Sequence, residues 1–149
     1  MKKIAVFWKK KNIESYANMS SSQLFKEVGN NNGNLAFVKA IDNQLLNKKI
    51  WIGWDFDPEY VKKNADMIVI PSANQLGPHN DLGGLAAKLE KTGLPIVSIG
   101  LGAQAPNFDV DIVLKEGTLR WIELINSKSI NGKKNIYTRG SYTTGQLIK

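Results

Sequence analysis

The chain of 149 residues has no cysteine and a single histidine, which excludes several kinds of site. Without cysteine there is no disulfide, cysteine-ligated zinc, iron–sulfur cluster or thiol nucleophile. One histidine, His79, cannot supply a multi-histidine metal site. We therefore expect no metal site built from cysteine or from several histidines.

Long hydrophobic runs are also missing. The apolar runs are far shorter than the roughly 20 residues that a membrane-spanning helix needs. The opening Met1-Lys2-Lys3 resembles the start of a signal peptide, but the apolar run from Ile4 to Trp8 is short and three lysines follow it. We expect a soluble, cytoplasmic protein without a transmembrane segment. Peripheral attachment at the inner face of the membrane stays open as an alternative.

Arginine is scarce, although the chain is basic with a formal net charge of +7. Of the 20 cationic side chains only Arg120 and Arg139 are arginine. Arginine binds phosphate and recognises guanine better than lysine does, because it can donate two parallel hydrogen bonds. The lysines occur as scattered pairs such as Lys48-Lys49 and Lys133-Lys134, a pattern typical of a solvated surface. We expect no nucleic-acid partner.

Apolar runs of strand length alternate with segments of helical periodicity. The predicted strands are residues 4–8, 50–54, 67–70, 95–99 and 135–138. Helices are predicted over residues 34–46 with Asn34 as N-cap, from Asp57-Pro58, over 81–92 and 117–127, and from Ser141, with a short one capped within 20–22. Near-continuous apolar strands are typical of a parallel sheet buried on both faces. The alternation predicts an α/β fold, a Rossmann-like doubly wound parallel sheet of about five strands.

The end of the sequence is unusual for a complete domain. The last predicted helix begins at Ser141, and its first apolar residues of buried character, Leu147 and Ile148, stand directly before the final residue. We expect residues 1–149 to form a single Rossmann-like domain that is the N-terminal part of a longer two-domain protein. A frayed terminal helix is the alternative.

Ligands of open parallel sheets bind at the carboxyl ends of strands, so the segments after the predicted strands hold the candidate residues. The first such segment is a polar stretch of roughly 25 residues, long for a loop in a compact domain. It ends in Asn32, Gly33 and Asn34 at a predicted helix start, where free N–H groups attract anions. A flexible turn with a capping asparagine is the alternative.

The segment after the fourth predicted strand, Gly100 to Ala105, fits the loose dinucleotide fingerprint G-x-G-x-x-A. It does not follow the first strand, and Pro106 interrupts any immediate helix, so we do not expect NAD or FAD. Its two glycines, Gly100 and Gly102, would still let a ligand approach the backbone closely. A tight turn is the alternative.

Charged groups are few in these segments. Arg139 follows the last predicted strand and can pair with a phosphate or carboxylate of a ligand, or with a structural acid. His79 is a weak candidate for acid–base chemistry, with a solvated loop position as the alternative. Asp55 and Asp57 could bind a metal or sugar hydroxyls, but turn and capping roles are favoured.

Several segments carry a family resemblance. They are residues 31–37 (NNGNLAF), 66–74 (DMIVIPSAN) and 95–104 (PIVSIGLGAQ), followed by 136–143 (IYTRGSYT) with Leu147 shortly after. In this order they resemble the amino-terminal half of the polysaccharide pyruvyl transferase family. One departure is Gly140, which stands where many members carry an acidic residue.

The resemblance implies one half of a GT-B-type two-domain transferase. Such an enzyme transfers the enolpyruvyl part of phosphoenolpyruvate, as a ketal, onto a sugar of an exopolysaccharide or cell-wall polymer. It implies no cofactor, phosphoenolpyruvate as donor substrate, and a sugar or glycan acceptor that is lipid-linked or nucleotide-activated. Most donor-binding residues would lie in the C-terminal domain, so this chain alone would be inactive.

The resemblance also implies an acceptor cleft. Its residues here would be Asn32, Gly33, Asn34, Asn74, Gly100, Gly102 and Gln104, with Arg139 balancing anionic charge. The alternative is a noncatalytic Rossmann-like module that binds a nucleotide or sugar.

Overall fold

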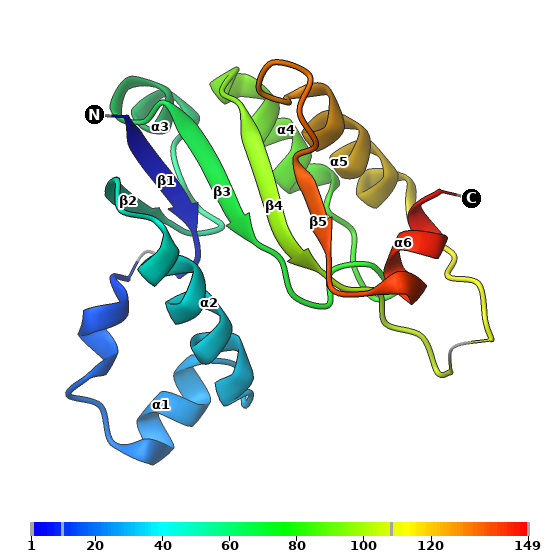
Figure 1. Ribbon diagram of the computed structural model, residues 1–149. Helices are drawn as coiled ribbons and strands as arrows, with labels where there is room; N and C mark the ends of the chain where they lie inside the picture. Colours follow the sequence, from blue (N-terminus) through cyan, green and yellow to red (C-terminus); the bar gives the residue numbers. More distant parts are fainter. Residues whose placement is uncertain (1, 10, 108, 149) are drawn as a thin grey trace.

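Five parallel strands form one sheet in the order β2-β1-β3-β4-β5 (Figure 1). The computed structural model describes residues 2–9, 11–107 and 109–148. The strands are β1 (Lys3–Phe7), β2 (Lys48–Ile52), β3 (Met67–Pro71), β4 (Ile96–Leu101) and β5 (Ile136–Thr138). The helices are the 3-10 helix η1 (Ile13–Tyr16), α1 (Ser21–Glu27), α2 (Asn32–Gln44), α3 (Pro58–Asn64), α4 (Gly83–Thr92), α5 (Glu116–Ser127) and α6 (Ser141–Leu147).

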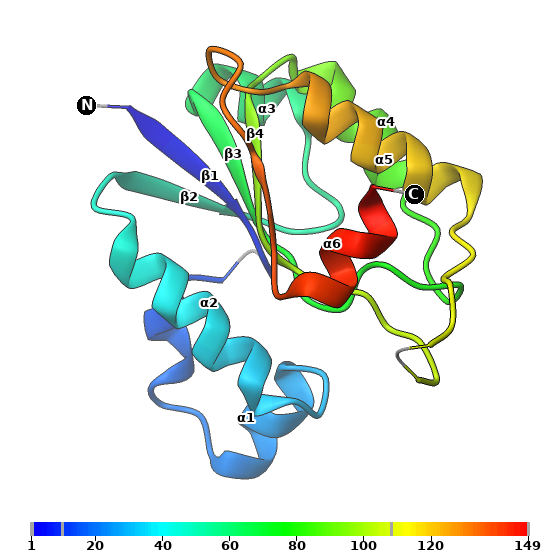
Figure 2. The same cartoon turned by 45° about the vertical axis from the view of Figure 1, so that its right-hand side comes forward.

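This arrangement confirms the predicted α/β class and the all-parallel sheet, and it is consistent with a Rossmann-like fold. The strand order reverses between β1 and β3. As Figures 1 and 2 show, α3, α4 and α5 cover one face of the sheet, and α2 lies on the other.

Alternation along the strands divides the apolar residues between these two faces. In β1, Ala5 and Phe7 join the large core beneath α3, α4 and α5, whereas Ile4 and Val6 pack with Ile41 of α2. The large core is closed by fully buried side chains of the covering helices: Val61, Leu89, Trp121 and Ile125. On this face, buried apolar side chains fill the space between the sheet and the helices from β2 to β4.

The face that carries α2 is less complete, so the prediction that both faces are buried is wrong for part of the sheet. In β4, Ile96 and Ser98 are fully buried on the α4–α5 side, whereas Val97 and Ile99 stay partly exposed on the other. In β5, Tyr137 is 51% exposed. α2 lies over the β2–β1–β3 side and leaves the β4–β5 side open (Figure 2).

Local capping explains where several helices begin and end. Ser20 and Gln23 form a capping box at α1, which confirms the short serine-capped helix. Asp57 caps α3 with Pro58 in its first turn, and Gly93 ends α4 with φ +66°. α2 begins earlier than predicted, because Asn31 rather than Asn34 is its N-cap and accepts from the Gly33 N–H.

The polar stretch after β1 is not an open loop. It folds into η1 and α1, whose apolar residues Ile13, Tyr16 and Val28 pack against Val38 of α2. The Trp8 indole N–H donates to the Tyr16 hydroxyl at 2.9 Å and ties this cluster to the end of β1. The structure also differs from the predicted strand 50–54. β2 ends at Ile52, and after Gly53 a turn begins at Trp54.

Candidate functional site

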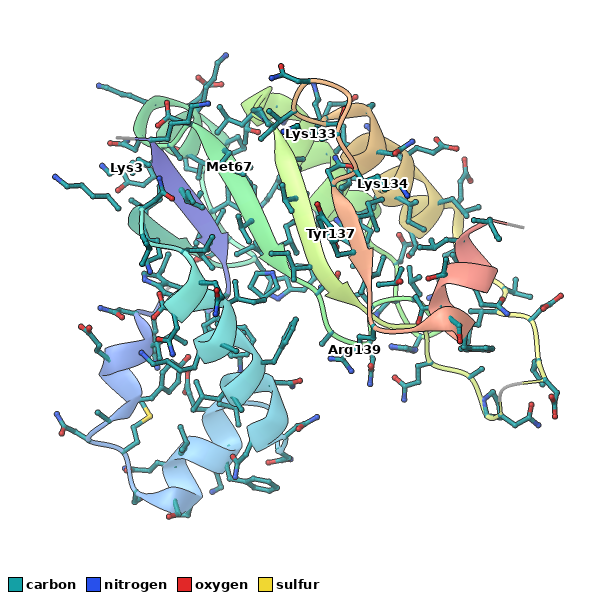
Figure 3. All side chains as sticks on the ribbon, viewed as in Figure 1. Lys3, Met67, Lys133, Lys134, Tyr137 and Arg139 are labelled. Carbon is teal, nitrogen blue, oxygen red and sulfur yellow. The ribbon has the colours of Figure 1, made fainter. Side chains whose placement is uncertain are left out.

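Arg139 directly follows β5 and lies at the carboxyl edge of the sheet (Figure 3). Its Nε donates to the carbonyl oxygen of Gly100 at 3.1 Å, and its Nη1 donates to Oδ1 of Asn74 at 2.9 Å. The guanidinium carbon lies 5.6 Å from the ring centroid of Phe37 in α2. Three parts of the chain thus orient the Arg139 guanidinium. They are Asn74 in the segment after β3, Gly100 in β4, and Phe37 in α2.

The Arg139 side chain keeps capacity for a ligand. A guanidinium carries more N–H donors than the two that bind Gly100 and Asn74, and the residue is exposed. Because its orientation is already fixed by protein contacts, little rotamer entropy remains to be lost on binding. The arrangement suits a carboxylate or a phosphate, which accept parallel hydrogen bonds from the guanidinium fork.

Gly100 is required by the protein's own packing at this site. Its φ of +71° favours glycine, and a Cβ at this position would lie 2.3 Å from Cζ of Phe37. The pairing of β4 with β5 shifts register here, between Ile99 and Leu101, and the Gly100 carbonyl accepts from Arg139. The missing side chain of Gly100 thus makes room for the Phe37 ring. The predicted close approach of a ligand to this backbone stays a prediction.

Gly102 behaves in the same way. A Cβ there would meet Oδ1 of Asn74 at 3.0 Å and Cδ of Arg139 at 3.2 Å. The two predicted glycines therefore hold the Arg139 side chain, with Phe37 and Asn74, close against the β4 backbone. Four predicted residues, Asn74, Gly100, Gly102 and Arg139, are brought together in this way.

His79 joins the same cluster through Asn74. Its Nε2 lies 3.3 Å from the Asn74 carbonyl oxygen and 3.0 Å from Nδ2 of Asn80. Its ring folds back over Gly77, where a Cβ would lie 2.5 Å from the imidazole. Asn74 thus contacts the imidazole through its backbone and Arg139 through its side chain. The imidazole is exposed at the edge of the cluster.

Buried hydroxyl groups support these segments from below. The Ser72 and Ser98 hydroxyls lie 2.7 Å apart between β3 and β4, and both residues are fully buried. The buried Thr143 hydroxyl accepts from the Ala103 N–H at 3.0 Å and joins α6 to the segment after β4. Satisfied buried polar pairs of this kind fix neighbouring backbone segments relative to one another.

The three predicted residues of α2 divide between two sides of the helix. Asn34 is three residues before Phe37, so it lies on the same helix face, one turn closer to the N-terminus, with Gly33 beside it. Asn32 lines a different hollow, which faces η1 and α1 and also contains Ile13 and Lys39. Only Gly33 and Asn34 therefore lie toward the Arg139 side.

Gln104 takes part in the contact between the segments that follow β3 and β4. Its backbone N–H donates to the Leu76 carbonyl at 2.8 Å, which continues the parallel bridge between Leu76 and Ala103. The residue is exposed. Its structural role shown here is to fasten the β3 loop to the β4 loop.

Other candidate groups have structural roles or lie elsewhere. Asp57 caps α3, which confirms the favoured interpretation of this residue as a helix cap. Among the described residues no group of three or more His, Asp or Glu side chains could hold a metal ion. No helix within the described ranges is long and apolar enough to cross a membrane.

A distinct ion pair lies between the segment after β1 and α1. The Lys11 ammonium donates to Oε1 of Glu27 at 2.8 Å, and this hydrogen bond lowers the pKa of Glu27 and raises that of Lys11. Burial raises the pKa of the Tyr16 hydroxyl nearby. This pair links α1 to the segment that follows β1 and is separate from the Arg139 cluster.

Phe37 is the residue of the site that sequence reasoning did not single out. It faces the sheet from α2 and contacts Arg139. In the sequence alone, an aromatic residue at helical spacing indicates only core packing.

Comparison of this chain with family models, with curated proteins and with solved structures gives no match.

Proposed function

We propose that the carboxyl edge of β3, β4 and β5 binds an anionic ligand that also carries hydroxyl groups. The observation that supports this proposal is the Arg139 guanidinium, which is held by Asn74, Gly100 and Phe37 and yet remains exposed. Arginine fixed in this manner recognises carboxylates and phosphates. Amide side chains and backbone groups around it can bind sugar hydroxyls.

We further propose that the chain is the acceptor-side half of a polysaccharide pyruvyl transferase with a GT-B-like architecture. In that reaction two sugar hydroxyls add to the enol carbon of phosphoenolpyruvate, and phosphate leaves. One hydroxyl proton ends on the methyl carbon and the other on phosphate, so an acid and a base are needed. Arg139 would bind an anionic group of the activated sugar, and Asn34, Asn74 and Gln104 its hydroxyls.

His79 is the conventional acid–base group within reach of this cluster, and we assign it only a weak candidate role. The support for this role is the contact of its Nε2 with the Asn74 carbonyl oxygen at 3.3 Å, which keeps the imidazole next to a residue of the proposed binding site. The proposal assigns the transfer step to the full two-domain enzyme. The chain on its own is expected to bind without turnover.

A noncatalytic binding module is the second candidate function. The composition of the cluster favours this function. The cluster contains amides, glycines and one guanidinium, and few side chains that could act as a catalytic acid or base. Such a module would hold a nucleotide or a sugar phosphate in the same place. It would bind tightly without any other domain.

An NMR titration of amide resonances tests these proposals. We expect a nucleotide-activated sugar to shift the amides of Asn34, Asn74, Gly102 and Arg139 in the wild type. Arg139→Gln should abolish these shifts, whereas the matched control Arg120→Gln, whose side chain is exposed on the outer surface of α5, should keep them. Shifts with phosphoenolpyruvate alone would instead place the donor at Arg139. No shift with either compound would contradict the binding site itself.

A further inference from the structure

A turn brings the side chains of His79 and Asn80 back onto the segment that follows β3. The Asn80 N–H donates to the Gly77 carbonyl oxygen at 3.2 Å, which closes a four-residue turn with Pro78 at its second position. The hydroxyl of Thr118, a fully buried residue of α5, donates to the Asn80 carbonyl oxygen at 3.1 Å. The backbone of Asn80 is thus fixed on both sides, and its side chain starts from a defined position.

The carboxamide of Asn80 has one orientation that fits its neighbours. Its Nδ2 lies 3.0 Å from the backbone carbonyl oxygen of Gln75 and 3.4 Å from that of Asn74. Carbonyl oxygens only accept hydrogen bonds, so the amide must turn its NH2 group toward them, and not its own oxygen. The Gln75 carbonyl takes one of the two Nδ2 hydrogens, which leaves the other for a second acceptor.

That second acceptor is the imidazole of His79. Nδ2 of Asn80 lies 3.0 Å from Nε2, whereas the Asn74 carbonyl oxygen is 3.3 Å from Nε2 and 3.4 Å from Nδ2. Hydrogen bonds donated by N–H groups are typically about 2.9–3.0 Å long, so the two shorter contacts of the amide are favoured. Nε2 then accepts, and the hydrogen-bond network assigns the proton of the neutral imidazole to Nδ1. A proton on Nε2 would instead bring two donors together at 3.0 Å.

The Nδ1 side of the ring is available to a ligand. Nδ1 has no hydrogen-bond acceptor among the residues that the structure describes, and His79 is exposed. The ring reaches this position because Gly77 has no side chain, since a Cβ there would lie 2.6 Å from Nδ1. Asn74 contacts the imidazole with its carbonyl oxygen and Arg139 with Oδ1. An N–H donor and a guanidinium that share one neighbour suit an anionic ligand.

We propose that Asn80 is a positioning residue that holds neutral His79 as the Nδ1–H tautomer, and that this N–H donates to the anionic ligand at Arg139. The part that concerns the ligand rests on the proposed function. The tautomer also decides between two roles of the imidazole. Asn80 uses the Nε2 lone pair, so His79 is not free to remove a proton from a sugar hydroxyl. A neutral imidazole N–H can instead stabilise negative charge on a substrate oxygen.

The single histidine of the chain makes the tautomer directly measurable, because every imidazole signal belongs to His79. The sample is an isotope-labelled protein at about pH 8, where an ordinary imidazole is neutral. A long-range proton–nitrogen correlation spectrum distinguishes the protonated ring nitrogen from the unprotonated one. We expect the proton on Nδ1. A proton on Nε2, or one shared equally between the two nitrogens, would overturn the proposal.

Matched variants test whether Asn80 is the cause. Asn80→Ala removes the donor to Nε2, so the proton should move toward Nε2, which can then donate to the Asn74 carbonyl oxygen. Asn64→Ala is the control, because the Asn64 amide also donates to a backbone carbonyl, that of Tyr60 in α3, at 2.9 Å. It should leave the imidazole spectrum unchanged. A folded Asn80→Ala that keeps the proton on Nδ1 would overturn the positioning role.

A second variant covers the case in which Asn80→Ala does not fold. Gly77→Ala leaves Asn80 in place, but its methyl group would lie 2.5 Å from Cε1 of His79 and must push the ring aside. We expect the imidazole to lose its bond to Asn80 and the Nδ1–H signature with it. A proton that stays on Nδ1 in this variant would show that the contact with Asn80 does not set the tautomer.

A titration with inorganic phosphate, at constant pH and ionic strength, tests the donor role. We expect phosphate to shift the Arg139 amide and Nδ1 of His79 together. His79→Ala should weaken phosphate binding about tenfold, because a hydrogen bond to a charged group is lost. A shift of Arg139 without a shift of Nδ1 would overturn the donor role and leave the tautomer standing. No shift of either would contradict the proposed anion site itself, on which the tautomer measurement does not depend.

Discussion

The guanidinium carbon of Arg139 lies 5.6 Å from the ring centroid of Phe37. This contact joins the segment after β5 to α2, although the two belong to opposite ends of the chain. It also makes the candidate site depend on how α2 packs, because Phe37 sits where Gly100 has no side chain. Substitutions of Phe37 should therefore alter ligand binding although this residue does not touch the proposed ligand.

Phe37→Leu tests that dependence. The variant loses the ring beneath Arg139 and leaves a small cavity, so we expect a loss of about 1–2 kcal/mol in the free energy of unfolding. Urea denaturation measures the loss, and the NMR titration with an activated sugar should show weaker binding. Phe25→Leu in α1 is the control, because Phe25 is 45% exposed. Unchanged binding in Phe37→Leu would show that ligand binding at Arg139 does not depend on the Phe37 ring.

Gly100→Ala should be strongly destabilising. The new Cβ would lie 2.3 Å from Phe37 Cζ in a backbone with φ +71°, and together these costs are about 3 kcal/mol. Gly132→Ala is a matched control, since Gly132 has φ +69° and open space around it. It should cost about 1 kcal/mol, the backbone part alone. Equal urea midpoints for Gly100→Ala and Gly132→Ala would show that the Phe37 ring can move aside without a loss of stability.

A third prediction concerns the closest approach of α4 and α5. A Cβ on Gly117 would lie 2.0 Å from Asp81 Oδ1 and 2.7 Å from the Gly83 backbone nitrogen. Gly117→Ala must separate two helix starts, and we expect a loss of about 3 kcal/mol. Gly84→Ala, with nothing near its Cβ, should instead stabilise by up to about 0.5 kcal/mol. Thermal unfolding of both variants distinguishes them in sign.

Acid should weaken the attachment of α1. The Lys11 hydrogen bond lowers the folded-state pKa of Glu27 below its ordinary 4.5. The contribution is therefore fully present above pH 4.5 and is lost as pH falls through the lower folded-state pKa. Wild type should be slightly more stable than Glu27→Gln at pH 7, with the difference vanishing at low pH. A difference that persists in acid would refute the ionic contribution.

Local signals in the sequence predicted most of the fold. Asp57-Pro58 and Gly93 mark helix ends through neighbours within a few residues, and both assignments are confirmed. The predicted second strand was shifted because Trp54 extends an apolar run, yet it packs edge-on against Phe7 beyond the end of β2. Its place depends on β1, which no local pattern contains.

The candidate site was predictable only in part, for the same reason. Asn74, Gly102 and Arg139 could be grouped because they follow strands that share one sheet edge. Which of them touch depends on loop conformation, and the role of Phe37 depends on the packing of α2. The division of Asn32 from Asn34 followed from the true start of α2, two residues earlier than its predicted N-cap.

The position of β1 between β2 and β3 has a consequence during synthesis. Lys3 pairs with Lys48, and Ile4 pairs with Met67, so both neighbours of this strand leave the ribosome long after it does. Until then the apolar Ile4–Phe7 segment has no sheet to join. Such a segment is a ready site for chaperones or for aggregation in the nascent chain. The three lysines that follow it can act as gatekeepers against that aggregation while the rest of the sheet is made.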